Sequence, residues 1–261
     1  MNYRVSDWMG RFGNNLIQIS SGLMNAERDN GNLYFPKHSM LNDTKIILNE
    51  NNQDDYFEDL FWGISFDENI RRRLCKEYLS KLIIFQEEKL DDDDLVIHLR
   101  GGDIFQSNPP KNYVQAPFSF IKGVIEIVKP KTIYVVYEDE TNPNVSMISK
   151  LYSNAIFIND LQIGVNLILS TKKLVITGVT TFSRMLAMCS LNIKTIYQPS
   201  FIKDHDYILN INDDIDCGDN HITIKFCDYN DVENIILPVR NDIKYPQWYW
   251  NNDMYNKLIS L

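Results

Sequence analysis

The sequence predicts an α/β protein whose sheets are mostly parallel and covered by helices, and two features support this class. Between about residues 95 and 200, short apolar runs alternate with segments whose apolar residues recur at helical spacing, which is typical of a parallel sheet. The run from Thr132 to Tyr137 is almost continuously apolar, as expected of a strand buried on both faces. We divide the 261 residues into an amino-terminal half (1–93), a second half (94–235) and a carboxyl-terminal tail (236–261).

The amino-terminal half opens with a strand candidate at residues 1–9, a glycine turn at 10–15 and a helix pattern at 16–26. A helix amino terminus that is approached through glycines offers unpaired N–H groups and the positive end of the helix dipole to an anion. An ordinary strand–helix turn is the alternative interpretation. Further along, the sequence predicts strands at 31–36 and 46–48 and an amphipathic helix at 70–85.

Two other features of this half favour structural roles. An aromatic cluster is interpreted as core rather than as the lining of an acceptor cleft, because large aromatic side chains dominate cores; it consists of Phe57, Leu60, Phe61 and Trp62. The four consecutive acids from Asp91 to Asp94 alternate in direction. A metal site needs converging oxygens, so we interpret these acids as a mainly solvated linker at the domain boundary.

The stretch from residue 95 to residue 103 is the centre of the second half. Its first part is an apolar run that predicts a strand entering the core. Residues two apart in a strand share a face, so His98 and Arg100 point the same way at the strand's carboxyl end, where open α/β sheets bind ligands. Arginine suits bidentate phosphate contact, and Gly101 and Gly102 let the backbone approach a ligand. A diphosphate fits this pattern; a salt-bridged arginine beside an ordinary glycine turn is the alternative.

The rest of the second half continues the alternation. The patterns predict helices at 117–128, 144–152, 164–170 and 184–190, and strands at 132–137, 155–158, 173–178 and 192–197. The turn from Thr177 to Ser183 carries hydroxyl groups between a strand and a helix, which suits a second phosphate contact. Beyond it, residues 222–226 predict an edge strand. An aromatic segment from Trp248 to Trp250 is expected to pack back on the amino-terminal half.

Composition excludes several classes of protein. A net charge of −9 and a pI of about 5.0 argue against nucleic acid as a general partner. The four cysteines show no CxxC spacing, which disfavours a structural zinc site and a disulfide framework. No segment approaches the ~18 apolar residues of a membrane span, and no apolar signal region begins the sequence. We therefore expect a cytoplasmic protein; the sequence leaves its oligomeric state open.

Three short motifs, in chain order, resemble those of the fucosyltransferases. Met9 to Asn15 is similar to the amino-terminal motif of protein O-fucosyltransferases and to the Gly-x-x-Gly-Asn-Gln opening of bacterial alpha-1,2-fucosyltransferases. His98 to Asp103 resembles the His-x-Arg-x-x-Asp motif that the alpha-1,2-, alpha-1,6- and protein O-fucosyltransferases share. Thr180 to Ser183 resembles their later Ser-Ser-Phe-Ser or Ser-Thr-Phe turn. The resemblance covers residues 9 to about 198.

The resemblance implies a GT-B-like architecture with two Rossmann-like halves that face each other across a cleft. Residues 1–93 would then form the acceptor-side half, and residues 94–235 the half that binds the nucleotide-sugar. It further implies an inverting glycosyltransferase that moves fucose from GDP-fucose to a hydroxyl of a glycan acceptor. No metal and no other cofactor is expected for such an enzyme.

The same resemblance implies roles for single residues. Arg100 would bind the β-phosphate and help GDP to leave, because a preorganised cation stabilises the charge that develops on the phosphate. His98 would lie beside it, near the ribose or the diphosphate. The predicted catalytic residues are therefore Arg100, His98 and Asp103, and for Asp103 we favour the role of holding the Arg100 loop. The residues implied in donor binding are Gly10, Arg11, Phe12, Gly13, Asn14, Arg100, Gly101, Thr180, Thr181, Phe182 and Ser183.

The sequence also departs from the family pattern. Gly101 stands where a second arginine is usual, and Asn15 where glutamine is usual. Lys172 or Lys173 occupies the position at which protein O-fucosyltransferases carry an acid linked to base recognition. The amino-terminal half is short for this architecture. The candidates for a general base that activates the acceptor hydroxyl are Asp7, Glu27, Asp54, Asp55 and Asp103.

Two alternatives therefore stay open beside the fucosyltransferase. One is a glycosyltransferase that uses another nucleotide-sugar, and the other is a non-catalytic protein that binds a nucleotide-sugar on the same fold. A nucleotide-dependent oxidoreductase is disfavoured, because no GxGxxG sequence follows a predicted strand.

Overall fold

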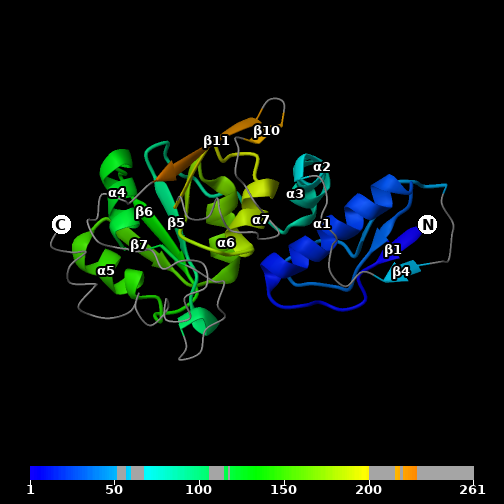
Figure 1. Cartoon of the computed structure of the whole chain (residues 1–261), viewed down its shortest axis with the longest axis horizontal. Coiled ribbons are helices and arrows are strands. Elements are labelled where there is room, and N and C mark those ends of the chain that lie inside the picture. The colour runs from blue at the N-terminus through cyan, green and yellow to red at the C-terminus, as the bar shows by residue number, and fades with distance from the viewer. Residues whose placement is uncertain are drawn as a thin grey trace, which may run out of the picture.

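The computed structural model describes residues 1–51, 57–59, 68–105, 115–116, 118–199, 215–217 and 220–227. Its described strands form two sheets, one of four strands in the order β3-β2-β1-β4 and one of seven in the order β10-β11-β9-β8-β5-β6-β7 (Figure 1). Both sheets are mostly parallel, and helices pack against them. The predicted fold class, an α/β protein of GT-B-like build, is confirmed.

The amino-terminal sheet is built around β1 (Asn2–Arg4), which pairs in parallel with β2 (Leu33–Tyr34) and β4 (Phe57–Asp59). The short strand β3 (Lys45–Ile46) adds to β2 in antiparallel fashion. Helix α1 (Phe12–Arg28) connects β1 to β2 and is buried on almost every side from Phe12 to Ala26. A helix that is covered all round lies between other layers of a protein.

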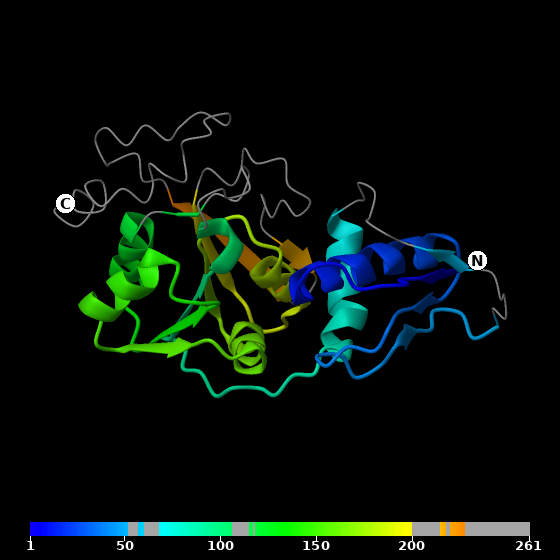
Figure 2. The same cartoon turned by 90° about the horizontal axis from the view of Figure 1, so that it is seen from below.

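The amphipathic helix predicted at 70–85 is a continuous helical stretch of three parts. These parts are α2 (Glu68–Leu74), the π-helical turn η1 (Cys75–Leu79) and α3 (Ser80–Leu82). Cys75 and Leu79 of η1 are fully buried in the apolar cluster that also contains residues of α1. Residues 83–94 then run to the second half, as Figure 2 shows.

Residues 91–93 are exposed, which confirms the interpretation of this run as mainly solvated, but that interpretation is wrong for Asp94. Asp94 is only 5% exposed, and one of its carboxylate oxygens accepts a hydrogen bond from the Asp91 N–H (2.9 Å), which closes a turn before the next strand. Asp91 forms an ion pair with Lys131 (2.6 Å), and Asp92 forms one with Lys172. Three of the four acids thus have structural partners.

The second half contains five parallel strands: β5 (Leu95–Leu99), β6 (Ile133–Tyr137), β7 (Ala155–Ile158), β8 (Lys173–Ile176) and β9 (Thr195–Pro199). The helices are α4 (Phe118–Val128), α5 (Pro143–Leu151), α6 (Leu161–Ser170) and α7 (Phe182–Cys189). Leu95, Ile97 and Leu99 pack with α4 and α5 on one face, whereas Val96 packs with α6 and α7 on the other. This alternation along β5 is the two-residue period of a strand.

The strand order places a reversal point in the middle of this sheet. From β5 the chain moves outward to β6 and β7, and then crosses to β8 and β9 on the other side of β5. This is the order of a doubly wound sheet, in which ligands bind outside the carboxyl ends of the strands where the order reverses. The expected position lies between β5 and β8.

Two other predictions concern the last part of the chain. The strand expected at 222–226 is β11 (Asn220–Cys227), which pairs in parallel with β9. The short strand β10 (Ile215–Cys217) pairs in antiparallel fashion with Asn220–Ile222 of β11, so the assignment as an edge strand is wrong for Ile222. Among the described strands, residues 223–226 pair with β9 alone. The predicted tail (236–261), with its aromatic segment from Trp248 to Trp250, lies outside the described residues. So do the side chains of the aromatic cluster that the sequence predicts in the amino-terminal half.

The predicted domain boundaries stay predictions.

Among the helices of the described residues, none combines the length and the apolar character that a membrane crossing requires.

The two halves share one apolar core at the contact between α1 and α7. A single cluster of buried side chains includes Leu16 and Ile17 of α1 as well as Met185 and Leu186 of α7. In Figure 1 the start of α1 faces α7 across the boundary between the halves. The two helices come close together at Gly13, where an added Cβ atom would lie 2.5 Å from the backbone nitrogen of Phe182.

We predict that Gly13→Ala destabilises the protein, because the added methyl group meets backbone atoms of α7 that cannot rotate away. Overpacking of this kind costs about 1–3 kcal/mol, which denaturant unfolding would measure. Gly123→Ala is the matched control: it lies in α4, and no atom lies within 4 Å of its added Cβ. Its stability should be unchanged or raised by up to about 1 kcal/mol. An equal effect of both substitutions would contradict the close contact between α1 and α7.

Candidate functional site

The structure brings the three motif segments together at the reversal point of the sheet. The first lies at the start of α1, the second follows β5, and the third leads from β8 into α7. Direct contacts join them. The Thr181 hydroxyl donates a hydrogen bond to Asn14 Oδ1 (2.8 Å) across 167 positions of sequence, and Arg11 lies 3.7 Å from the Asp103 carboxylate. We call this place, at the carboxyl ends of β5 and β8, the junction site.

Two helix amino termini meet at the junction site. Helix α1 starts after its N-cap residue Arg11, and α7 after its N-cap residue Thr181. Neither N-cap side chain caps its own helix, and neither helix has an acid in its first turn. Gly13 in the first turn of α1 lies against Phe182, the first residue of α7. The positive ends of two helix dipoles therefore lie close together, which favours an anion.

Buried amides hold the loop that enters α1. The Gln18 side chain accepts a hydrogen bond from the Met9 N–H (3.0 Å) and donates one to the Asp7 carbonyl (3.1 Å). Asn15 donates to the Met9 carbonyl (3.1 Å). Gly10 takes a left-handed conformation (φ +69°), which glycine adopts at little cost. Asn15 is 2% exposed and thus holds the turn from within the core.

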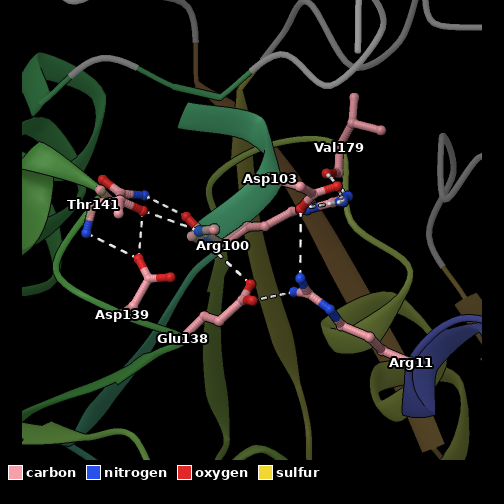
Figure 3. Close-up of polar contacts among 10 residues, drawn as sticks. Arg11, Arg100, Asp103, Glu138, Asp139, Thr141 and Val179 are labelled. Atoms are coloured by element: carbon pink, nitrogen blue, oxygen red, sulfur yellow. Dashed lines mark hydrogen bonds and ion pairs between the residues drawn. The ribbon is translucent and has the colours of Figure 1, made fainter. Parts of the chain in front are cut away.

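Arg100 is held at the end of β5 by its backbone and reaches across the site with its guanidinium group. The Asn142 side chain donates a hydrogen bond to the Arg100 carbonyl (2.8 Å). The guanidinium group makes long contacts to both carboxylate oxygens of Asp103 (3.3 and 3.4 Å) and to the Val179 carbonyl (3.5 Å) (Figure 3). The side chain is 17% exposed, so most of it is shielded from water.

The two glycines after Arg100 turn their N–H groups toward the loop that follows β6. The Gly101 N–H donates to Glu138 Oε2 (3.3 Å), and the Gly102 N–H donates to the Thr141 hydroxyl (3.0 Å). Gly102 has φ +65°, and a Cβ atom there would lie 2.8 Å from Glu138 Oε1. Burial alone would raise the pKa of Asp139, but hydrogen bonds from Thr141 and the Arg11 charge hold that pKa below its usual value.

Sequence reasoning missed Glu138, Asp139 and Thr141 as residues of this site. Glu138 forms an ion pair with Arg11 and so joins the two halves of the chain (Figure 3). A signal was present in the sequence, because Glu138 and Asp139 directly follow the buried strand β6. The carboxyl ends of neighbouring parallel strands lie at the same edge of a sheet.

His98 is buried beneath the junction site as a neutral ring. Its residue is 6% exposed, and its ring centroid lies 5.2 Å from that of Phe182. Burial, and next the charge of Arg100, lower the pKa of His98 to about 3. Its Nδ1 atom has no hydrogen-bond partner among the described residues. The ring therefore supports Phe182 and carries no charge near neutral pH.

The other predicted site residues differ in exposure. Thr180 is 5% exposed and Ser183 is fully buried, so the Ser183 side chain faces the core. Lys173 begins β8 and therefore lies at the amino end of the sheet, opposite the junction site; it contacts the Asp92 carbonyl (2.8 Å). Lys172, beside it, forms an ion pair with Asp92.

The candidate general bases are not gathered in one place. Asp103 lies at the junction site between Arg11 and Arg100. Glu27 lies in the last turn of α1 and contacts Arg73 (2.5 Å), far from the junction site at the first turn. Asp54 and Asp55 lie outside the described residues. Among the described residues, no group of three or more histidine, cysteine or acidic side chains has metal-binding geometry.

The buried, neutral state of His98 predicts a dependence of stability on pH. Below pH 6.5 the unfolded chain takes up a proton at His98, whereas the folded protein does so only near pH 3. The free energy of unfolding therefore decreases as the pH is lowered. Between pH 7.5 and pH 5.5, His98 contributes about 1.4 kcal/mol to this decrease. Urea unfolding of His98→Gln should show a fall that is smaller by this amount. Parallel pH profiles of the two proteins would contradict the buried, neutral ring.

Comparison with known proteins finds similar solved structures but no similar sequences. No protein-family model matches the chain, and no curated protein matches it. The crystal structure of POFUT1 in complex with GDP matches with a TM-score of 0.46 and 12% identity, over 72% of this chain and 94% of that chain. A structure of POFUT1 in complex with GDP-fucose matches with a TM-score of 0.35 and 9% identity, over 72% of this chain and 69% of that chain.

Proposed function

We propose that this protein is an inverting glycosyltransferase that binds a nucleotide-sugar at the junction site, with GDP-fucose as the favoured donor and a glycan hydroxyl as the acceptor. One observation carries the proposal: three segments that are far apart in sequence converge at the reversal point of a doubly wound sheet. These are the same segments whose residues resemble fucosyltransferase motifs. A cytoplasmic location is part of this proposal.

The charges of the junction site support a diphosphate ligand. Arg11 comes from the amino-terminal half and Arg100 from the second half, so a ligand between them takes one guanidinium group from each side. Guanidinium groups bind phosphate oxygens in bidentate fashion. The amino termini of α1 and α7 and the N–H group of Gly101 add hydrogen-bond donors and positive potential.

The same groups supply the chemistry that a leaving nucleoside diphosphate needs. When the bond from the sugar to the β-phosphate breaks, negative charge develops on the phosphate oxygens. Arg100, fixed through its backbone by Asn142, stabilises this charge more in the transition state than in the ground state. Because two arginines provide the positive charge, we propose that transfer requires no metal. Asp103, held by both arginines, acts as a positioning residue.

A second candidate is a non-catalytic protein that binds a nucleotide-sugar at this site. It is favoured by the state of two predicted catalytic side chains: His98 is neutral and buried, and Asp103 is paired with arginines. Thermal-shift titration with GDP, UDP, dTDP and CDP identifies the base, since a ligand that binds the folded state raises the melting temperature. Hydrolysis or transfer of the sugar then separates an enzyme from a binding protein.

We predict that Arg100→Ala lowers the rate of sugar transfer by about 10²–10³-fold, because one preorganised phosphate contact is lost. Initial rates with GDP-fucose and a panel of glycan acceptors would measure this, and circular dichroism would check the fold. Arg28→Ala is the control; Arg28 ends α1, far from the site, and pairs with Asp29 (2.8 Å). Its rate should stay within about twofold of the wild-type rate. A wild-type rate for Arg100→Ala would contradict the proposed site.

Transfer should also survive removal of divalent cations. The expected result is an unchanged rate in excess EDTA, because Arg11, Arg100 and backbone amides neutralise the diphosphate in place of a metal. Rates would be compared before EDTA treatment, after it, and after magnesium or manganese is restored. Loss of activity that a cation restores would show that the arginines do not suffice.

A further inference from the structure

The side chain of Glu138 bridges two hydrogen-bond donors from different halves of the chain. One carboxylate oxygen pairs with the Arg11 guanidinium group at the start of α1. The other accepts from the Gly101 N–H, 3.3 Å away, in the loop after β5 (Figure 3). The Glu138 side chain is 33% exposed and that of Arg11 is 62% exposed, so both can move without disturbing the core.

The neighbouring acid, Asp139, has a different role. Its Oδ1 accepts hydrogen bonds from the backbone N–H (2.9 Å) and the hydroxyl of Thr141. The Thr141 hydroxyl in turn accepts from the Gly102 N–H (3.0 Å). Asp139 is thus fixed in the turn after β6, whereas Glu138 extends from that turn to Arg11 and Gly101.

The donors that Glu138 contacts are also donors that the proposed diphosphate needs, and the inference that follows rests on that proposed function. A carboxylate and a phosphate both accept charge-assisted hydrogen bonds from guanidinium and backbone N–H groups. The two cannot hold the same donors at once. In addition, like charges repel at the short distances of such a site.

We propose that Glu138 determines the affinity of the junction site by competing, from within the protein, with the phosphate groups of the ligand. A diphosphate binds by taking Arg11 and the Gly101 N–H from Glu138, and the carboxylate turns toward solvent. When the nucleoside diphosphate leaves, Glu138 takes these donors back and so favours its release. Arg11 exchanges a contact between the two halves for a contact with the ligand.

Isothermal titration of the full chain with GDP and with inorganic pyrophosphate tests this competition. Glu138→Gln should bind both probes about three- to fivefold more tightly than wild type, a factor at the upper end of what a partly exposed ion pair contributes. Glu138→Asp should bind more tightly as well, since its shorter side chain does not span to Arg11. Glu140→Gln is the control, because Glu140 is exposed, lies two residues after Glu138 and carries the same charge. The affinity of this variant for both probes should stay within about twofold of wild type.

A double-mutant cycle links the effect to Arg11. Arg11→Gln should weaken binding, and adding Glu138→Gln to it should tighten binding by a smaller factor than Glu138→Gln does in the wild type, because only the competition for the Gly101 N–H remains. A purely structural role of Glu138 would lower the melting temperature of Glu138→Gln without tightening binding. If the wild type binds GDP and Glu138→Gln shows either that result or weaker binding, the competition is overturned and the proposed function stays intact. Absence of binding by wild type to either probe would overturn the proposed function itself.

Discussion

The close approach of two helix amino termini is the constraint on which the rest of this structure depends. Gly13 of α1 and Phe182 of α7 leave no room for a Cβ atom between them, and apolar side chains of both helices join one core behind this contact. Two positive dipole ends repel each other unless anionic or polar groups lie beside them. At this point the Thr181–Asn14 hydrogen bond and the carboxylates of Asp103 and Glu138 lie next to the helix termini and the arginines.

This electrostatic arrangement connects the fold to the proposed chemistry. The strand order of the larger sheet reverses between β5 and β8, and doubly wound sheets bind ligands outside the carboxyl ends of the strands at such a point. Two of the three motif segments directly follow β5 and β8. The positive groups that favour a diphosphate are paired with carboxylates of the same protein. The affinity of the site for an anionic ligand is then a difference between two sets of similar contacts, and under the proposed function such a balance would favour release of the nucleoside diphosphate after transfer.

Features with strong local signals were predictable from the sequence. The apolar runs gave β5 and β6, and the helical spacing gave α4 and the helical stretch from α2 to α3. The contact of Asn14 with Thr181 was not predictable from the residues alone, because it depends on how two halves of the chain pack. The burial of His98 depends on Phe182, which lies 84 positions later in the sequence. The pairing of β10 with the first residues of β11 was not predictable either, because the three residues of β10 give no clear strand pattern.

The central claim is that the three segments form one binding site. Hydrogen–deuterium exchange of the full chain, measured with and without saturating GDP, tests it most directly, because exchange reports each backbone amide separately. The account predicts that GDP slows exchange together in residues 10–15, 100–103 and 180–184, while the amides of α4 and α5 stay unchanged. Protection in only one of the three segments, protection elsewhere in the chain, or none at all would contradict a single diphosphate site at this junction.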